Sequence, residues 1–144
     1  MPERAISTII EDQQPVSAQS DTTVAEAARI MRSRRIGALL VMEGARLAGI
    51  FTERDALFRV LAEGRDAATT PLREVMTRDP RTISPDRPFG HALHIMYEGG
   101  FRHVPVVRDG RAIGVVSARD ALGPEMRQFI ADLETRTRVG EILG

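Results

Sequence analysis

The chain has 144 residues, with 20 basic side chains, 20 acidic side chains and no cysteine. This length predicts one domain, which can bury roughly 70% of the surface of its unfolded chain. The lack of cysteine excludes a disulfide framework and any thiolate metal site, and it is typical of a reducing compartment. No apolar run approaches the roughly 20 residues of a membrane span, and the N-terminus lacks a signal-peptide core. We therefore expect a cytoplasmic protein that does not associate with membranes.

The balance of charge argues against nucleic-acid binding, for which a basic surplus is typical. The cluster Arg32, Arg34 and Arg35 is the local exception, and cations at a helix C-terminus explain it equally well. All basic residues are arginine. Guanidinium groups suit bidentate contacts with phosphate, but codon bias is the better explanation for most of them. The composition allows an anion site without demonstrating one.

In chain order, the first predicted element is a helix that begins after Thr23, which forms a candidate capping box with Glu26. Its apolar residues follow the i, i+3, i+4, i+7 spacing of one helix face, at Val24, Ala27, Ala28 and Met31. Two apolar runs follow, 38–42 and 48–51, and predict a buried hairpin. A further helix is predicted from Thr52 to about Gly64, and Thr70-Pro71-Leu72 is typical of a short capped helix.

The same pattern then occurs a second time. Residues 80–122 repeat residues 15–57 without a gap, at a constant offset (80 − 15 = 65). Pro88 suits the first turn of the second long helix, Gly99-Gly100 ends it, and the last helix of the repeat begins at Ser117. Because a unit that cannot bury its apolar face alone usually buries it against its twin, two paired clefts are expected.

A final helical stripe lies near the C-terminus, at Met126, Phe129, Ile130 and Leu133. Packing of this helix on its own domain is the favoured interpretation, and packing on a second subunit is the alternative.

The most specific strings are Gly49-x-x-Thr52-x-x-Asp55 and Gly114-x-x-Ser117-x-x-Asp120, with Phe101-Arg-His-Val-Pro-Val-Val107 in the second copy. Together they resemble a tandem pair of cystathionine-β-synthase (CBS) domains, a Bateman module, of the stand-alone bacterial type. The resemblance implies an α/β (α+β) fold of two β-α-β-β-α repeats related by a pseudo-twofold axis, packed sheet to sheet with flanking helices. It implies repeat 1 at 6–64, a linker with a short helix at 65–79, repeat 2 at 80–123, and a C-terminal helix and tail at 124–144.

Each strand-to-helix corner carries a hydroxyl and a carboxylate. Free N–H groups and the positive end of the helix dipole favour phosphate at such a corner, and a carboxylate can accept hydrogen bonds from ribose hydroxyls. The resemblance gives this role to Thr52, Asp55, Ser117 and Asp120. The alternative is a capping box, which needs no ligand.

The second repeat is expected to bind anions better. The resemblance places Arg102 and His103 against nucleotide phosphates, whereas the first copy has Gly37 and Ala38 at the matching positions. It also gives adenine contacts to Thr82 and Ile83, where the first copy has the smaller Ser17 and Ala18. Val104 and Pro105, in the same string, are further candidate nucleotide-binding residues. Arg54 and Arg119 are candidates because they occur at both corners, although a solvated helix surface explains them equally well.

The function predicted on this basis is regulatory. We expect a homodimer that binds AMP, ADP or ATP, with NAD and S-adenosylmethionine as further candidates, and that signals to an unknown protein through its conformation. No cofactor is required. An enzyme is disfavoured because no nucleophile elbow or P-loop motif occurs. A metal site at His91, His94 and Glu98 is disfavoured because the sequence fixes no further ligand. A ligand-free scaffold is the main alternative.

Overall fold

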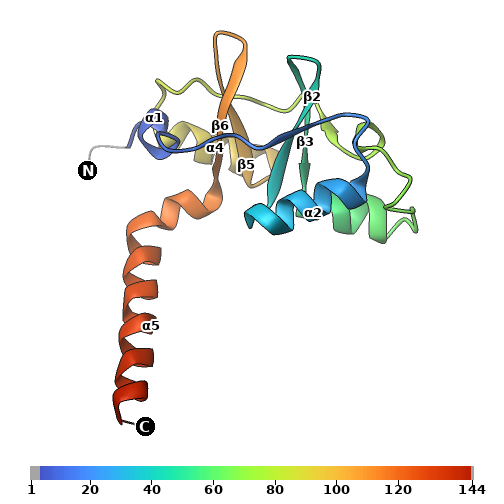
Figure 1. Cartoon of the computed structure of the whole chain (residues 1–144). Helices are drawn as coiled ribbons and strands as arrows, with labels where there is room; N and C mark the ends of the chain where they lie inside the picture. Colours follow the sequence, from blue (N-terminus) through green and yellow to red (C-terminus); the bar gives the residue numbers. More distant parts are fainter. Residues whose placement is uncertain (1–3, 144) are drawn as a thin grey trace.

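The computed structural model of the chain describes residues 4–143, without the side chains of residues 124–127 and 141–143. Two β-hairpins stand side by side, and a long C-terminal helix leads away from them (Figure 1). The first half contains α1 (Ile6–Ile9), β1 (Ser17–Gln19), α2 (Val24–Arg34), β2 (Ala38–Glu43), β3 (Arg46–Thr52), α3 (Glu53–Asp55) and the π-helical η1 (Ala56–Leu61). The second half contains η2 (Leu72–Glu74), β4 (Thr77–Arg78), α4 (Phe89–Gly99), β5 (His103–Arg108), β6 (Arg111–Ser117), η3 (Ala118–Leu122) and α5 (Gly123–Leu143).

The predicted repeat is confirmed by the pairing of the strands. β1 runs parallel to β2, and the second copy reproduces this contact as a parallel bridge between Ile83 and Val106. The hairpins β2–β3 and β5–β6 are antiparallel, and each has an irregularity at the same place, after Val41 and after Val106. Two mixed α+β units with equivalent registers therefore form the fold that the resemblance implied.

The helix ends follow the predicted local chemistry in most places. The Thr23 hydroxyl accepts a hydrogen bond from the Glu26 N–H at 3.2 Å and begins α2. Gly100 ends α4 in the left-handed conformation, at φ 71°. The short helix after Thr70 is present as the 3-10 helix η2, but the predicted cap is wrong. Thr70 donates its hydroxyl hydrogen to the Asp66 carbonyl at 2.7 Å, because a turn at 66–70 places that carbonyl within reach.

The segment that leads into each repeat packs on the other repeat. We call residues 5–13 and 71–79 the first and second leading segments. In the first segment, Ile6 and Ile10 belong to the apolar core of the second repeat, together with Phe89 and Val116. The second segment supplies the first core, which also includes α2 and Phe51, with Leu72, Val75 and Met76.

Gly49 and Gly114 allow each leading segment to pack closely on the other repeat. A Cβ atom on Gly49 would lie 2.6 Å from the Met76 Sδ and 2.7 Å from the Thr77 carbonyl oxygen. A Cβ atom on Gly114 would lie 2.9 Å from the Ile10 side chain. The two equivalent glycines thus leave space for the leading segments.

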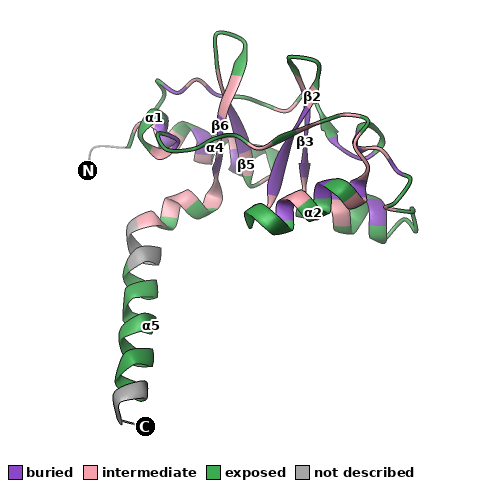
Figure 2. Cartoon of the chain, viewed as in Figure 1, coloured by how far each residue is buried: buried purple, intermediate pink, exposed green. Residues whose placement is uncertain are grey.

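A third apolar cluster joins the two sheets. Ala38, Leu40 and Ile50 of the first hairpin are buried, and Ala112 and Val115 of β6 pack against them. Figure 2 shows that the buried residues of both hairpins lie away from the hairpin tips, which are exposed. Sheet-to-sheet packing therefore holds the halves together.

The prediction that the C-terminal helix packs on its own domain is wrong. α5 extends away from the body, and Phe129, Ile130 and Leu133 are 58%, 47% and 45% exposed (Figure 2). The physical reason lies at Gly123, whose helical φ and ψ of −50° and −57° continue η3 directly into α5. No turn brings the helix back to the core. The side chain of Met126, the fourth member of the predicted stripe, lies outside the described side chains.

Candidate functional site

The first corner joins β3 to α3 at Thr52. The Asp55 carboxylate accepts hydrogen bonds from the Thr52 N–H at 3.0 Å and from its hydroxyl at 3.2 Å. The Asp55 N–H donates to the Thr52 hydroxyl oxygen at 3.2 Å. This is a complete capping box, so the local hydrogen bonds alone explain why these two residues occur here.

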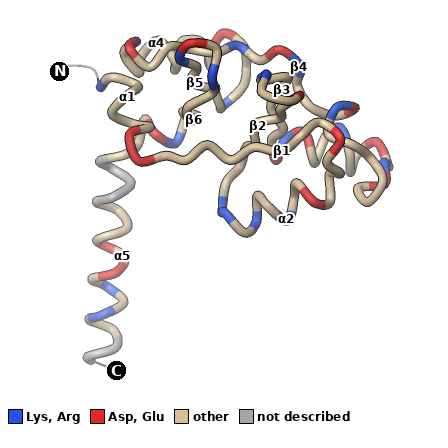
Figure 3. The backbone as a smooth tube through the Cα atoms, turned by 45° about the horizontal axis from the view of Figure 1, so that its top comes forward, with Lys and Arg blue, Asp and Glu red and all other residues tan. Residues whose placement is uncertain are grey.

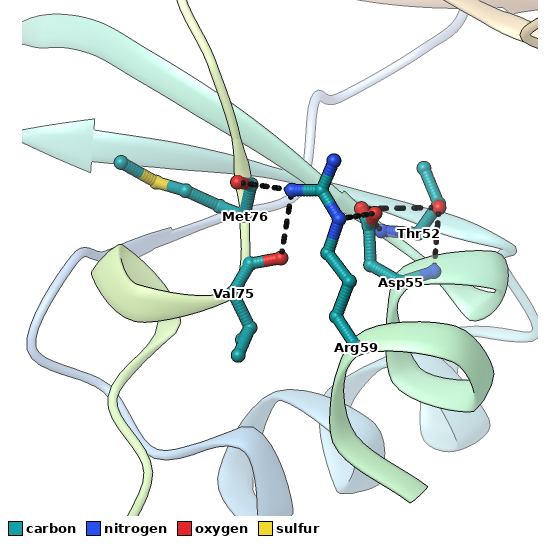
Figure 4. A network of polar contacts seen from close by, with 5 residues as sticks. All are labelled: Thr52, Asp55, Arg59, Val75 and Met76. Atoms are coloured by element: carbon teal, nitrogen blue, oxygen red, sulfur yellow. Dashed lines mark hydrogen bonds and ion pairs between the residues drawn. The ribbon is translucent and has the colours of Figure 1, made fainter. Parts of the chain in front are cut away.

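An arginine makes further contacts at this corner. Arg59 Nε lies 3.5 Å from Asp55 Oδ1, and Arg59 Nη1 donates to the Met76 carbonyl at 2.8 Å (Figure 4). The Asp55 side chain is only 8% exposed. Burial raises its pKa above the usual 3.8, while the Thr52 hydrogen bonds and the Arg59 and Arg54 charges act in the opposite direction. The carboxylate is therefore already committed to contacts within the chain.

The second corner is built in the same way but is more open. Asp120 Oδ2 accepts from the Ser117 N–H at 2.7 Å and from its hydroxyl at 3.4 Å. The position equivalent to Arg59 is Pro124, which has no cation to offer. Asp120 is half-buried, and no ion pair to it occurs among the described side chains. Its carboxylate is the less occupied of the two.

Each corner opens on a cavity. The first-corner cavity, of about 770 Å³, lies between Thr52 and Asp55 on one side and residues 77–81 and 99–103 on the other. The second-corner cavity, of about 690 Å³, lies between Ser117 and residues 13–16 and 34–38. Both volumes are within the range of small-molecule sites. Each cavity therefore combines a corner of one repeat with the leading segment of the other.

The structure gathers some of the predicted residues at these cavities. Thr52, Arg54 and Asp55 line the first, and Ser117 and Arg119 line the second. Arg102 and His103 line both, so they do not belong to the second corner alone.

Other predicted residues lie elsewhere. Ile83, Val104 and Pro105 are buried, Ser17 and Ala18 are paired with β2, and Thr82 is exposed beside the second core. None of these six lines either of the two cavities. Asp120 is not among the lining residues of the second cavity, although its partner Ser117 is. The nucleotide contacts assigned to these residues stay predictions.

A shared wall separates the cavities. It consists of Glu53, Arg102 and His103, which line both. Burial lowers the pKa of His103 below its usual 6.5; the nearby Glu53 and Asp120 oppose this shift, while Arg119 and Arg102 add to it. His103 is therefore a neutral imidazole at neutral pH, between a carboxylate and two guanidinium groups.

Comparison with known proteins identifies the fold. The profile of the CBS domain matches twice, at residues 6–62 and 72–123. The chain belongs to the CBS domain family. A relative from Arabidopsis thaliana, the mitochondrial CBS domain-containing protein CBSX3, is 32% identical over 80% of this chain and 58% of its own length. The chain spans only 21% of another relative from the same plant, CBSCBSPB1, which is 38% identical.

Solved CBS structures resemble the chain closely. The CBS domain protein NE2398 aligns with a TM-score of 0.80 at 28% identity, over 87% of this chain and 99% of its own. The CBS domain protein PAE2072 from Pyrobaculum aerophilum, complexed with AMP, aligns with a TM-score of 0.72 at 27% identity, over 79% and 88% of the two chains. The CBS domain pair of protein MJ0100, in complex with 5′-methylthioadenosine and S-adenosylmethionine, gives 0.74 at 29% identity, over 91% and 99%.

Several lining residues of this CBS pair were not found from the sequence. Arg34 and Arg35 were noticed only as a charged helix end, yet they line the second cavity. The Gln13 side chain lines it too, and it exchanges two 3.0 Å hydrogen bonds with the Val115 backbone. Arg59 gave no signal beyond its spacing of four residues from Asp55. The sequence alone could not show the contacts of Gln13 with Val115 and of Arg59 with Met76, because they join residues far apart in the chain.

The residues of the alternative metal site contact one another and Arg81. His94 Nε2 lies 2.9 Å from Glu98 Oε1, and Arg81 lies 3.5 Å from the other carboxylate oxygen. Within the described part of the CBS pair, no three His, Asp or Glu side chains come together as a metal site. Its described helices include none of sufficient length and apolarity to cross a membrane.

Proposed function

We propose that this chain is a regulatory protein that binds an adenosine-containing ligand and signals through the conformation of a dimer. The observation that carries the proposal is the pair of equivalent cavities, each bounded by a corner hydroxyl and by arginines. Related CBS structures hold AMP, or 5′-methylthioadenosine and S-adenosylmethionine, which supports an adenosine compound as the common element.

The chemistry of the second corner supports this assignment. The Ser117 hydroxyl can donate to a ligand oxygen, and the Asp120 carboxylate can accept from ribose hydroxyls. Arg102 and Arg119 supply positive charge for phosphate. The role is binding rather than catalysis. AMP, ADP and ATP are the first candidates, with NAD and S-adenosylmethionine next.

Dimer formation is the second part of the proposal. Among the described residues outside α5, five large apolar side chains are exposed, at Leu57, Phe58, Leu61, Tyr97 and Leu122. Leu57 and Leu122 occupy equivalent positions in the two repeats. Leu57, Phe58 and Leu61 lie together on η1, and we expect a second copy to cover exposed apolar side chains of this kind. The regulated protein is unknown, and we expect a cytoplasmic setting with no nucleic acid or membrane partner.

Native mass spectrometry of freshly purified protein tests both parts together. We expect a dimer mass with additional mass from a carried-over nucleotide. Titration with AMP, ADP, ATP, NAD and S-adenosylmethionine then ranks the ligands, and a ligand at about a hundred times its Kd should add about 2.7 kcal/mol of stability. If no adenosine compound binds or stabilises the chain, the proposal is wrong. Turnover of any of these compounds would contradict the non-catalytic role.

A ligand-free scaffold is the second candidate. The complete capping boxes at Thr52–Asp55 and Ser117–Asp120 favour it, because both corners are stable without a ligand. The same titrations decide between the two, since a scaffold would gain no stability from any of the compounds.

A further inference from the structure

The two cavities differ in how their arginines are engaged. At the first corner, Arg54 donates to the Gly100 carbonyl at 3.0 Å, and Arg59 contacts Asp55 and Met76. Arg78 donates to the Arg73 carbonyl at 3.1 Å, and Arg81 pairs with Glu98 at 3.5 Å. Four of the five arginines that line this cavity thus already have acceptors within the chain. Asp55 and Asp79 also line it and add negative charge.

The second-corner cavity has the opposite character. It is lined by Arg34, Arg35, Arg102 and Arg119, and none of their four guanidinium groups has a hydrogen bond or ion pair with a described residue. Glu53 is the one carboxylate among its described lining residues. Figure 3 shows basic residues gathered at the C-terminal end of α2, which borders this cavity. Unpaired guanidinium groups around a cavity favour an anion with several oxygens.

The backbone at Arg35 adds an independent observation. Arg35 ends α2 in the left-handed conformation, at φ 54°, where glycine is the favoured residue. Its equivalent in the second repeat is Gly100, at φ 71°. A side chain at such a position costs conformational energy, and residues held there cluster at ligand sites. The fold itself does not require an arginine here, because glycine occupies the equivalent position in the second repeat.

We infer that the second-corner cavity selects adenosine ligands with a chain of two or more phosphates, and that Arg34 and Arg35 of the first repeat bind the distal part of that chain. This rests on the proposed function and specifies its ligand. Arg102 and Arg119 lie on the wall and corner side of the cavity, whereas Arg34 and Arg35 approach from α2. Arginines of both repeats therefore surround the cavity. A single phosphate or a sulfonium group would not use positive charge on both sides.

Calorimetric titration of the intact chain with ATP, adenosine and S-adenosylmethionine tests the inference. We expect ATP to bind at least about tenfold more tightly than adenosine or S-adenosylmethionine, since each charged hydrogen bond can contribute a factor of that size. The variants Arg35→Gly and Arg34→Gln should each lose about tenfold in ATP affinity and leave adenosine binding unchanged. Arg32→Gln, on the same helix end but outside both cavities, is the control and should bind ATP as the parent does.

The Arg35→Gly variant should fold, so a loss of ATP affinity in it would not reflect unfolding. Glycine suits the left-handed position, so Arg35→Gly should unfold at the same temperature as the parent or at a higher one. If ATP, adenosine and S-adenosylmethionine bind equally well, or Arg35→Gly and Arg34→Gln bind ATP unchanged, the inference is wrong while the proposed function stands. If AMP, ADP and NAD also fail to bind the parent along with these three compounds, both are wrong.

Discussion

At the residue scale, the two corners differ mainly in the partners of one aspartate. Asp55 is held by Thr52 and by Arg59, which is itself anchored to the Met76 carbonyl. Asp120 has the same capping box, but proline replaces the arginine. The duplicated motif therefore supports an unequal pair of sites.

This asymmetry predicts unequal effects of two matched substitutions. Asp120→Ala should lower adenine-nucleotide affinity by about tenfold or more, whereas Asp55→Ala should lower it less, because Asp55 is already occupied by Arg59. Isothermal calorimetry measures both. Asp55→Ala should also lower the free energy of unfolding by about 1–2 kcal/mol, because it removes both the acceptor of the Thr52 N–H and the partner of Arg59. Equal losses of affinity, or a greater loss at Asp55, would contradict the ranking.

His103 gives a pH dependence with a defined sign. Its pKa in the folded chain lies below the unfolded value of 6.5, so the unfolded chain binds more protons between these two values. Its contribution to stability is therefore present above pH 6.5 and is lost as the pH falls through the folded pKa. Urea unfolding between about pH 7.5 and about pH 5.5 should show this loss, and His103→Gln should reduce it.

The groups that face His103 are Glu53, Asp120, Arg102 and Arg119, and the substitution leaves all four in place. His91→Gln, at an exposed position of α4, is the matched control and should retain the full pH dependence. If the free energy of unfolding of His103→Gln changes with pH as much as that of the parent, another group titrates.

The capping contacts at the corners, which the sequence offered as the alternative to ligand binding, could be predicted because this chemistry is local. Thr52 and Asp55 are three residues apart, and so are Ser117 and Asp120, and both pairs close the predicted box. The assignment of Arg102 to one corner could not be made from the sequence. Its repeat position places it in the second copy, but the packing of the two hairpins places it between the cavities.

At the scale of the elements, the crossing of the leading segments is the main feature that the sequence did not predict. Hydrophobic periodicity shows that a face is buried, but not which surface buries it. Ile6 and Leu72 precede different repeats, and each is fully buried in the core of the other. The crossing also differs in detail between the halves. β4 pairs with β3 through its backbone, whereas the Gln13 side chain takes the corresponding place beside Val115.

The two glycines under these crossings should not tolerate a methyl group equally. Gly49→Ala places a Cβ atom against the Thr77 backbone carbonyl, which is fixed by the β3–β4 pairing. We expect it to lower the free energy of unfolding by about 1–3 kcal/mol. Gly114→Ala meets the Ile10 and Gln13 side chains and should cost less. Chemical denaturation of both variants measures the difference, and a Gly49→Ala variant as stable as the parent would contradict this account.

At the scale of the whole molecule, several large apolar side chains are exposed on the described part of the chain. Tyr97 is 88% exposed and Leu61 is 72% exposed, and the stripe on α5 adds Phe129, Ile130 and Leu133. The sequence correctly predicted that α5 is an amphipathic helix. Its direction was missed, because a continuous helical backbone at Gly123 is not visible in an apolar pattern.

At this scale we predict how two substitutions change the oligomeric state. Leu61→Glu and Tyr97→Glu place charges in the proposed dimer surface and should shift the chain from dimer to monomer, because burying an unpaired charge is unfavourable. Sedimentation equilibrium measures the shift. Thr8→Glu, at an exposed position of α1, is the control and should leave the dimer intact. A dimer that persists with both Leu61→Glu and Tyr97→Glu would show that other residues form the interface.

The wall formed by Glu53, Arg102 and His103 has a consequence for any pair of bound molecules. Because the same three side chains face both cavities, we expect a molecule in one cavity to reorient or repel groups that contact a molecule in the other. We therefore predict that the two sites do not fill independently. A binding isotherm that reaches two molecules per chain should depart from that of identical, non-interacting sites.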